Sequence, residues 1–295
     1  MNPAEIVVAG SYNHDQVLRL DHLPAPGETC LALGRADSHG GKGSNQAVQA
    51  ALCGARVAML AAIGEDAAGE AALAMWADLG LDASAVARLA NAHTGSAVIL
   101  VDAQGENSIV VDLGANARLS ADHAQAAAAT IGAARLVLAQ LETPIEATKR
   151  AFALARAAGA TTLLNAAPAP DAIDSELLAL TDILAVNEVE ARALGDDDAL
   201  LGRVGQAVVK TLGAQGAVLL RKGEPPLARP ARGVEVVDTT GAGDAFIGAF
   251  AARLVATGDA AQALEWGLAA GALACTRLGA VTSFANGEAV AALAG

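Results

Sequence analysis

The sequence contains few aromatic residues. Phe, Trp and Tyr together make up 2% of the 295 residues, although 54% of the chain is hydrophobic. A core built around large rings is therefore excluded, and we expect one made of Ala, Val, Leu and Ile, with closely approaching helices. The length suits one large α/β domain with a small appendage.

Basic residues are also in short supply. The chain has 19 Lys and Arg against 32 Asp and Glu, a net charge of −13. Nucleic acids and anionic membranes require clustered Lys and Arg, so we expect neither as a partner. An anionic nucleotide then needs a local site or a metal ion.

Cysteines are few, and Cys30, Cys53 and Cys275 form no Cys-x-x-Cys pair. This pattern is typical of reduced thiols in a cytosolic protein. The acidic start Met1–Glu5 does not resemble a signal peptide, and no uncharged run is long and hydrophobic enough to span a membrane. We therefore expect a soluble cytoplasmic protein.

Short apolar runs alternate with alanine-rich stretches typical of helices. This rhythm predicts a parallel sheet with helices on both faces. Two further runs, separated by the turn Gly213–Gly216, are expected to be neighbouring strands. The strands are predicted at 6–9, 136–139, 161–164, 183–186, 208–212 and 217–220, and helices at 145–158, 175–180 and 188–194.

Residues 15–38 and 93–113 mix polar and apolar residues in extended stretches, the second with a turn at Asp102–Gly105. They predict a small second sheet that covers a cleft as a lid and dimerises through its other face. The alternative is a pair of ordinary hairpins on the main domain.

The segment Val237–Phe246 predicts a short apolar strand, a glycine turn and a helix. Gly241 and Gly243 permit backbone conformations closed to other residues, so amides at the helix start can converge on a phosphate. Asp244, one turn into the helix, is placed to deprotonate an attacking hydroxyl. The alternative is an acid that only offsets the helix dipole.

Commoner glycine motifs fit less well. A dinucleotide-binding fingerprint requires glycine where the chain has Phe246, and a Walker A loop requires Ser or Thr after Lys42, where the chain has Gly43. The first mismatch weakens the interpretation as a dehydrogenase, and the second rules out a P-loop.

Two segments, Gly40–Ala47 (GGKGSNQA) and Asp238–Asp244 (DTTGAGD), resemble the two signatures of the ribokinase-like carbohydrate kinase family. The resemblance runs across nearly the whole chain. It implies a single doubly wound, mostly parallel α/β domain over 1–295 with a β-sheet lid, and ATP-dependent phosphorylation of a sugar hydroxyl.

The resemblance also assigns roles to residues. Asp244 matches the catalytic base, and Gly241, Ala242 and Gly243 match an anion hole with it. From the residues alone, Asn13 and Asp15 would more often be turn residues after a strand. The positions matching sugar-binding residues are Asn13, His14, Asp15, Gly41, Lys42, Gly43, Ser44, Asn45, Glu142 and Asp244.

For the nucleotide, Asn187 and Glu190 match a segment associated with Mg²⁺ near the phosphates, although an Asn cap and first-turn acids at a helix start explain them equally well. Leu268 departs from the family, which usually has a polar residue near the adenine there. The other nucleotide-binding positions implied are Thr211, Leu212, Gly213, Ala214, Gln215, Gly216, Gly243 and Asp244. Those implied for an activating K⁺ are Asp238, Thr240, Ala274, Arg277, Gly279 and Ser283.

The favoured hypothesis is transfer of the γ-phosphoryl group of ATP to O5 of D-ribose by a homodimer. Asn13, Asp15, Asn45 and Glu142 together favour ribose. The rivals are the same reaction on deoxyribose, fructose or adenosine, and a non-catalytic sugar sensor, which the presence of Asp244 disfavours.

Overall fold

The computed structural model describes residues 3–170 and 172–295. Its centre is an eight-stranded sheet in the order β14-β13-β12-β11-β10-β9-β1-β4. The strands from β4 to β12 in this order are parallel, whereas β13 pairs antiparallel with β12 and β14 pairs antiparallel with β13. The strand bounds are β1 Ile6–Ala9, β4 Val57–Leu60, β9 Leu136–Ala139, β10 Thr161–Asn165, β11 Ile183–Asn187, β12 Ala207–Thr211, β13 Ala217–Arg221 and β14 Leu227–Arg229.

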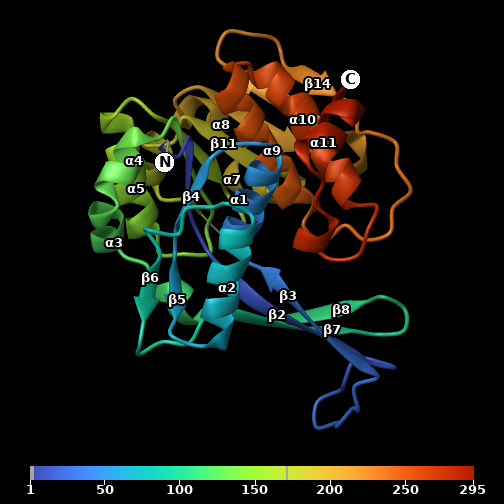
Figure 1. Cartoon of the computed structure of the whole chain (residues 1–295). Helices are drawn as coiled ribbons and strands as arrows, with labels where there is room; N and C mark the ends of the chain where they lie inside the picture. The colour runs from blue at the N-terminus through green and yellow to red at the C-terminus, as the bar shows by residue number, and fades with distance from the viewer. Residues whose placement is uncertain (1–2, 171) are drawn as a thin grey trace.

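Helices cover both faces of this sheet. In Figure 1, α3, α4 and α5 lie on one side, while α1, α9, α10 and α11 lie on the other. The helix bounds are α1 Lys42–Leu52, α2 Ala67–Asp78, α3 Ala121–Ala126, α4 Ala128–Ala133, α5 Ile145–Ala157, α6 Ser175–Ala179, α7 Glu188–Leu194, α8 Asp197–Arg203, α9 Ala242–Thr257, α10 Ala260–Ala274 and α11 Gly287–Ala294, with short 3₁₀ turns η1 Gly114–Arg118, η2 Gly213–Gln215 and η3 Val281–Ser283. The doubly wound α/β prediction is confirmed.

The sheet divides the core into two apolar clusters. Ile6 and Val8 of β1 pack with residues of α1, α9 and α10, whereas Val7 and Ala9 pack with residues of α5. This division follows from the alternation of side chains along a strand. Because both faces are buried, the central strands read as unbroken apolar runs.

Small residues let the helices approach closely, as the composition predicts. A Cβ atom built on Gly248 of α9 is 2.5 Å from the carbonyl oxygen of Gln46 in α1, and one on Gly267 of α10 is 2.9 Å from the Phe246 ring. Helices α1 and α9 therefore pack almost backbone to backbone. This contact brings their N-terminal turns together.

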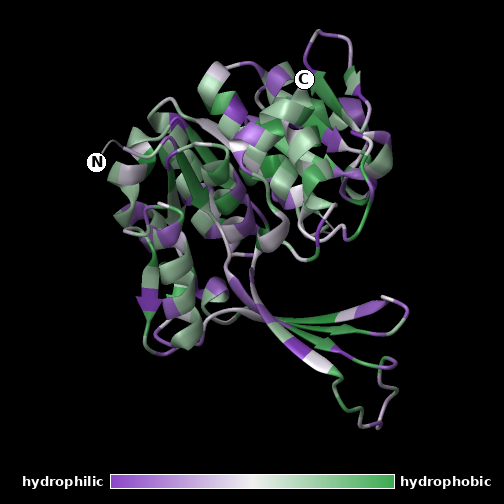
Figure 2. Ribbon diagram, turned by 45° about the vertical axis from the view of Figure 1, so that its right-hand side comes forward, coloured by the Kyte–Doolittle hydropathy of each residue, from purple (hydrophilic) through white to green (hydrophobic). Residues whose placement is uncertain are grey.

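A separate four-stranded sheet has the order β3-β2-β7-β8, with β2 Asn13–Arg19, β3 Gly34–Gly40, β7 Ser96–Val101 and β8 Asn107–Asp112. It projects from the main domain (Figure 2). Parallel pairing of β2 with β7 joins the two hairpins into one sheet. The alternative of ordinary hairpins on the main domain is wrong. We call this sheet the lid.

A two-stranded sheet pairs β5 Ala62–Gly64 with β6 Ala87–Leu89. Along the chain, these two strands follow β4 of the main sheet and precede β7 of the lid. Within residues 3–170 and 172–295, no helix combines the length and apolar character needed to cross a bilayer.

The apolar strand expected before the glycine turn is wrong. Residues 230–239 form no strand, and Val236 and Val237 are exposed. The backbone amides of Val237 and Asp238 donate to the carbonyl oxygen of Cys275, at the end of α10. This segment is a loop held by a helix terminus.

Candidate active site

A cavity of about 140 Å³ opens at the carboxyl ends of β10, β11 and β12, beside the N-terminal end of α9. The carboxyl edge of a parallel sheet is where α/β domains bind ligands, because loops and helix N-termini converge there. The cavity is lined by Lys42, Asn165, Ala167, Val186, Asn187, Glu190, Thr211, Gly241, Gly243, Asp244 and Ile247.

The glycine turn begins α9 on the cavity wall. Gly241 has a φ of 74°, and a Cβ atom on it is 2.9 Å from the Cβ of Ala280, so both conformation and space require glycine. Gly243 is helical with an ordinary negative φ, and its built Cβ has no atom within 4 Å. The expectation of an unusual backbone at Gly243 is wrong; its missing side chain leaves space in the cavity.

The amides at the start of α9 differ in availability. The N–H of Ala242 donates to the Thr239 carbonyl oxygen at 3.2 Å. The amides of Gly243 and Asp244 lie in the first turn, where an α-helix offers no acceptor. An anion in the cavity therefore has two free donors and the positive end of the helix dipole.

Asp244 is 8% exposed and faces α1. One carboxylate oxygen, Oδ2, accepts from Nδ2 of Asn45, and the other, Oδ1, accepts from Nε2 of Gln46, each at 2.9 Å. An acid that only offsets the helix dipole needs no such partners from another helix. The geometry favours a functional carboxylate fixed in one orientation.

Lys42 begins α1 and lines the same cavity. Burial lowers the pKa of its amine, but the charges of Asp244, Glu142 and Glu190 outweigh that effect and raise it. The amine is therefore a cation facing carboxylates and the cavity. Lys42 is among the expected sugar-binding residues, and its side chain lines the cavity that Asp244 also lines.

The expected sugar-binding residues Gly41–Asn45 are helical from Lys42 onward. Gly41 caps α1 with a φ of 85°, and Glu142 Oε2 accepts from the Lys42 amide at 2.9 Å and from Ser11 Oγ at 2.5 Å. A Cβ on Gly43 is 2.5 Å from the Ser11 amide nitrogen, so only glycine fits. This packing places Glu142 beside the first turn of α1.

Asn13 and Asp15 lie in β2, so the turn interpretation is wrong. Asn13 is 5% exposed, and its Oδ1 accepts from Nδ2 of Asn116 at 2.9 Å. Burial, and then the charge of Glu142, raise the pKa of Asp15 to about 7. Asp15 also lies against Gly40, where any Cβ overlaps its carboxylate.

His14 does not join this group. Side chains alternate along a strand, so His14 points to the other face of β2, where its Nε2 lies 3.3 Å from Asp37 Oδ1. The sugar-binding role expected for His14 is not supported by its position. Its sequence neighbours Asn13 and Asp15 point to the opposite face of the strand.

Asn187 and Glu190 form a capping box at the start of α7, as the alternative interpretation proposed. Both also line the cavity, and Glu190 is 4% exposed. Burial raises the pKa of Glu190. The capping and cavity roles are compatible, because the cap holds the carboxylate at the wall.

The turn Thr211–Gly216 follows β12 on the same edge. Thr211 reaches the cavity, Leu212 donates its amide to the Gly216 carbonyl oxygen, and the residues between are exposed. Leu268, by contrast, is 7% exposed and belongs to the core.

The residues implied for a monovalent cation lie on two loops. Asp238 accepts from the amide and hydroxyl of Thr240 and from the Gly279 amide, which ties the loops together. Ser283 donates its hydroxyl to the Ala280 carbonyl oxygen. Ala274 is buried at the end of α10, and Arg277 is exposed.

Five polar residues escaped the sequence analysis. Ser11 orients Glu142, Asn116 holds Asn13, and Gln46 contacts Asp244. Gln46 lies within the signature Gly40–Ala47, and Asn165 directly follows the strand predicted at 161–164, so those two had detectable signals. The complete set is Ser11, Gln46, Asn116, Gln140 and Asn165.

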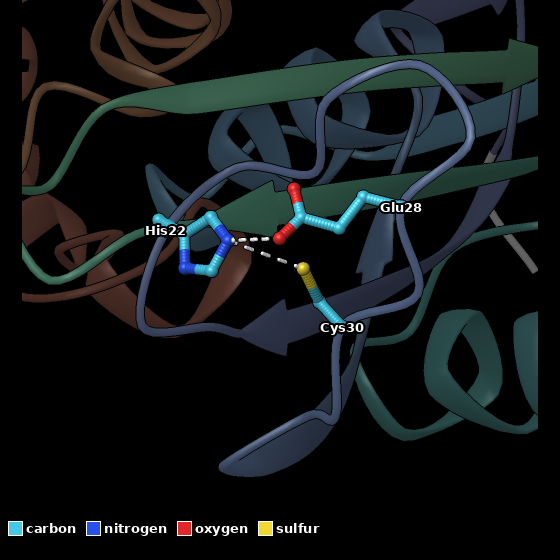
Figure 3. Close-up of side chains that lie close together, drawn as sticks. All are labelled: His22, Glu28 and Cys30. Carbon is cyan, nitrogen blue, oxygen red and sulfur yellow. Dashed lines mark hydrogen bonds and ion pairs between the residues drawn. The ribbon is translucent and has the colours of Figure 1, made fainter.

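A small group at the lid tip is unrelated to the cavity. His22 Nε2 bonds to Glu28 Oε1 at 2.7 Å and lies 3.6 Å from Cys30 Sγ (Figure 3). Glu28 also accepts from the Ala25 amide. These contacts stabilise the loop between β2 and β3, which explains why the three side chains lie together.

Comparison with known proteins agrees with this geometry. The family described as pfkB family carbohydrate kinase matches residues 3–286. A ribokinase of Haemophilus influenzae is 36% identical over 94% of each chain, and a deoxyribokinase of Salmonella typhi is 31% identical over 96% of each. The structure of Arabidopsis thaliana ribokinase complexed with ribose and ATP has a TM-score of 0.90 at 30% identity over 99% of each chain. The chain belongs to the pfkB family of carbohydrate kinases.

Proposed function

We propose that the protein transfers the γ-phosphoryl group of ATP to O5 of D-ribose, giving D-ribose 5-phosphate and ADP. One observation carries this proposal: Asn45 links the two halves of the site. Its Nδ2 donates to Asp244, which lines the cavity, and it lies in the first turn of α1, where the Lys42 amide donates to Glu142.

The sugar side offers acceptors for several hydroxyl groups. Within the described part of the chain, the buried Oδ1 of Asn45 has no hydrogen-bond partner. Asp15 and Glu142 add carboxylate oxygens nearby, since the charge of Glu142 acts on Asp15. A site built to bond vicinal hydroxyls disfavours analogues that lack one, which favours ribose over 2-deoxyribose.

In the reaction, Asp244 accepts the proton of the attacking hydroxyl as the new O–P bond forms and the bond from the γ-phosphorus to ADP breaks. The ordinary pKa of an aspartate is far below that of an alcohol, so the proton transfers late. The free amides of Gly243 and Asp244 and the cationic Lys42 stabilise the negative charge of the transferring group.

The polar side chains on the cavity wall include ligands suitable for Mg²⁺. Glu190 presents a buried carboxylate and Asn187 an amide, the hard oxygen ligands this ion prefers alongside its waters and phosphates. When bound, Mg²⁺ neutralises charge on the nucleotide phosphates. Potassium activation belongs to the same proposal and is supported by the proximity of Asp238, Thr240 and Gly279.

The test is ADP release by purified protein with Mg-ATP and ribose, 2-deoxyribose, fructose or adenosine, with K⁺ or Na⁺ as the monovalent cation. We expect ribose to give the highest kcat/KM, with more turnover in K⁺. Preference for another of these substrates contradicts the assignment of ribose as the phosphoryl acceptor. Sugar binding without turnover supports the sensor instead.

We also propose a cytoplasmic homodimer that pairs through the lid. Strand β8 is exposed throughout, with Ile109 at 53%, Val110 at 65% and Val111 at 49% exposure, and its outer edge is unpaired within the described chain. Contiguous apolar surface of this kind is typical of an interface. Val110→Asp should convert a dimer to a monomer in light scattering, and an unchanged mass contradicts the lid interface.

A further inference from the structure

A chain of buried amides runs from the strand β9 side of the site to Asp244. Gln140 Nε2 donates to Gln46 Oε1 at 2.7 Å, and Gln46 Nε2 donates to Asn165 Oδ1 and Asp244 Oδ1, each at 2.9 Å. Gln46 is 0% exposed and Gln140 is 1% exposed. Every polar atom of the Gln46 side chain is therefore used.

The direction of this chain is fixed by the backbone. Asn165 Nδ2 donates to the carbonyl oxygen of Ala185 in β11, so Asn165 Oδ1 is left as an acceptor. Only the NH₂ group of Gln46 can satisfy that acceptor, and this orientation leaves Gln46 Oε1 to accept from Gln140. Both hydrogens of Gln46 are thus committed, one of them to Asp244.

We infer that Gln46 is the positioning residue for Asp244, an inference that rests on the proposed role of Asp244 as the base. Asn45 and Gln46 each hold one oxygen of the carboxylate, which fixes its plane. Asn45 also faces the sugar, whereas Gln46 is anchored to the main sheet through Asn165 and Gln140. Gln46 therefore orients Asp244 whether or not sugar is bound.

The consequence concerns turnover rather than binding. Gln46 lies behind Asp244 and does not itself line the cavity, so its loss removes no direct contact with a ligand there. A carboxylate held on one side only can rotate away from the attacking hydroxyl. Misplacement of a catalytic group by about 1 Å costs about 100-fold in rate.

The first experiment compares Gln46→Leu with Gln49→Leu by steady-state kinetics. Gln49 is a matched control: it lies in the same helix, is 0% exposed, and donates to the Ala285 carbonyl oxygen and Cys53 Sγ rather than to Asp244. We expect Gln46→Leu to lower kcat by about 10- to 100-fold with both KM values within about 3-fold. Gln49→Leu should lower the Tm with near-normal kcat. Equal kinetic effects in the two variants would overturn the inference.

A second variant, Gln46→Glu, keeps the shape and the acceptor for Gln140 if Gln46→Leu fails to fold. Its new carboxyl group can donate to Asp244 only when protonated. The ratio of its kcat to that of the wild type should therefore rise as the pH falls from about 8 to about 5.5. A ratio independent of pH contradicts the inference.

Asp244→Asn is measured in parallel to separate the two ideas. If it retains turnover, the proposed base is wrong. If it is inactive while Gln46→Leu behaves as wild type, the base stands and only the positioning role of Gln46 fails.

Discussion

The central sheet and the lid contrast in how their strands are buried. All four residues of β9 are buried, whereas all six residues of β8 are exposed. Helices cover both faces of the first sheet, while the second projects from the domain (Figure 2). The difference teaches that the main domain supplies the buried core and positions Asp244 and its cavity, whereas the lid carries Asn13 and Asp15 on β2 and presents an exposed apolar strand.

The sharpest test of the main-domain half of this comparison is Asp244→Asn. The amide cannot accept the hydroxyl proton, so kcat should fall by at least about 1,000-fold with ribose and ATP affinity within a few-fold of wild type. Single-turnover kinetics and calorimetric binding measure the two quantities. Substantial residual turnover removes Asp244 from the base role.

A matched pair of apolar deletions compares the stability of the two regions. Leu138→Ala in β9 removes a fully buried side chain and should cost about 2–5 kcal/mol of unfolding free energy. Ile109→Ala in β8 should change it by less than about 0.5 kcal/mol, because that side chain is half exposed. Urea unfolding at matched protein concentration measures both. Similar losses contradict the contrast.

Substitutions at Gly241 and Gly243, the two glycines at the start of α9, distinguish the effect of backbone strain from the effect of lost space for a ligand. Gly241→Ala should destabilise the fold by more than about 1 kcal/mol, because of its positive φ and the Ala280 contact. Gly243→Ala should fold normally but weaken ATP use, since its methyl group enters the cavity. Thermal melts and the KM for ATP distinguish them. A destabilised Gly243→Ala with normal kinetics would refute this assignment.

The smallest expected effect is a pH dependence in the lid. The pKa of Asp15 in the folded chain is about 7, above the ordinary 3.8. Its contribution to stability is therefore full below about 4 and is lost as the pH rises through about 7. Asp15→Asn should gain Tm relative to the wild type over that window. The gain is absent if Asp15 ionises normally.

The same group should affect sugar binding in the opposite sense. Ionised Asp15 accepts hydroxyl hydrogen bonds, so the KM for ribose of the wild type should fall a few-fold as the pH rises through about 7. Asp15→Asn should show a higher KM that does not vary with pH in this range.

Most of the main domain could be predicted from sequence because its strands are continuous apolar runs. The predicted strand at 136–139 and helix at 188–194 have the bounds that the structure shows. The segment before the glycine turn was the exception. Its valines match the pattern of a strand, but residues 230–239 form none, and strand pairing depends on tertiary neighbours that a local pattern does not reveal.

The part of the site that could be predicted from the sequence is the part marked by the spacing of its glycines. Gly241 and Asp244 lie where the signature places them, at the start of α9. Gln46 was overlooked because a buried glutamine has no pattern of its own; its role depends on partners 94 to 198 residues away in sequence. The assignment of His14 to the sugar followed its place in sequence between Asn13 and Asp15. Neighbouring residues of a strand point to opposite faces, so adjacency in sequence does not give adjacency in space.

The sequence by itself determined the order of strands and helices, the two glycine turns and the family, because each depends on residues close together along the chain. Only the tertiary structure decided that the two hairpins join through β2 and β7, that Lys42 lines one cavity with Asp244, and that Asn45 and Gln46 together hold Asp244. Those features depend on how closely α1 and α9 approach, and that distance is set by packing across the whole core.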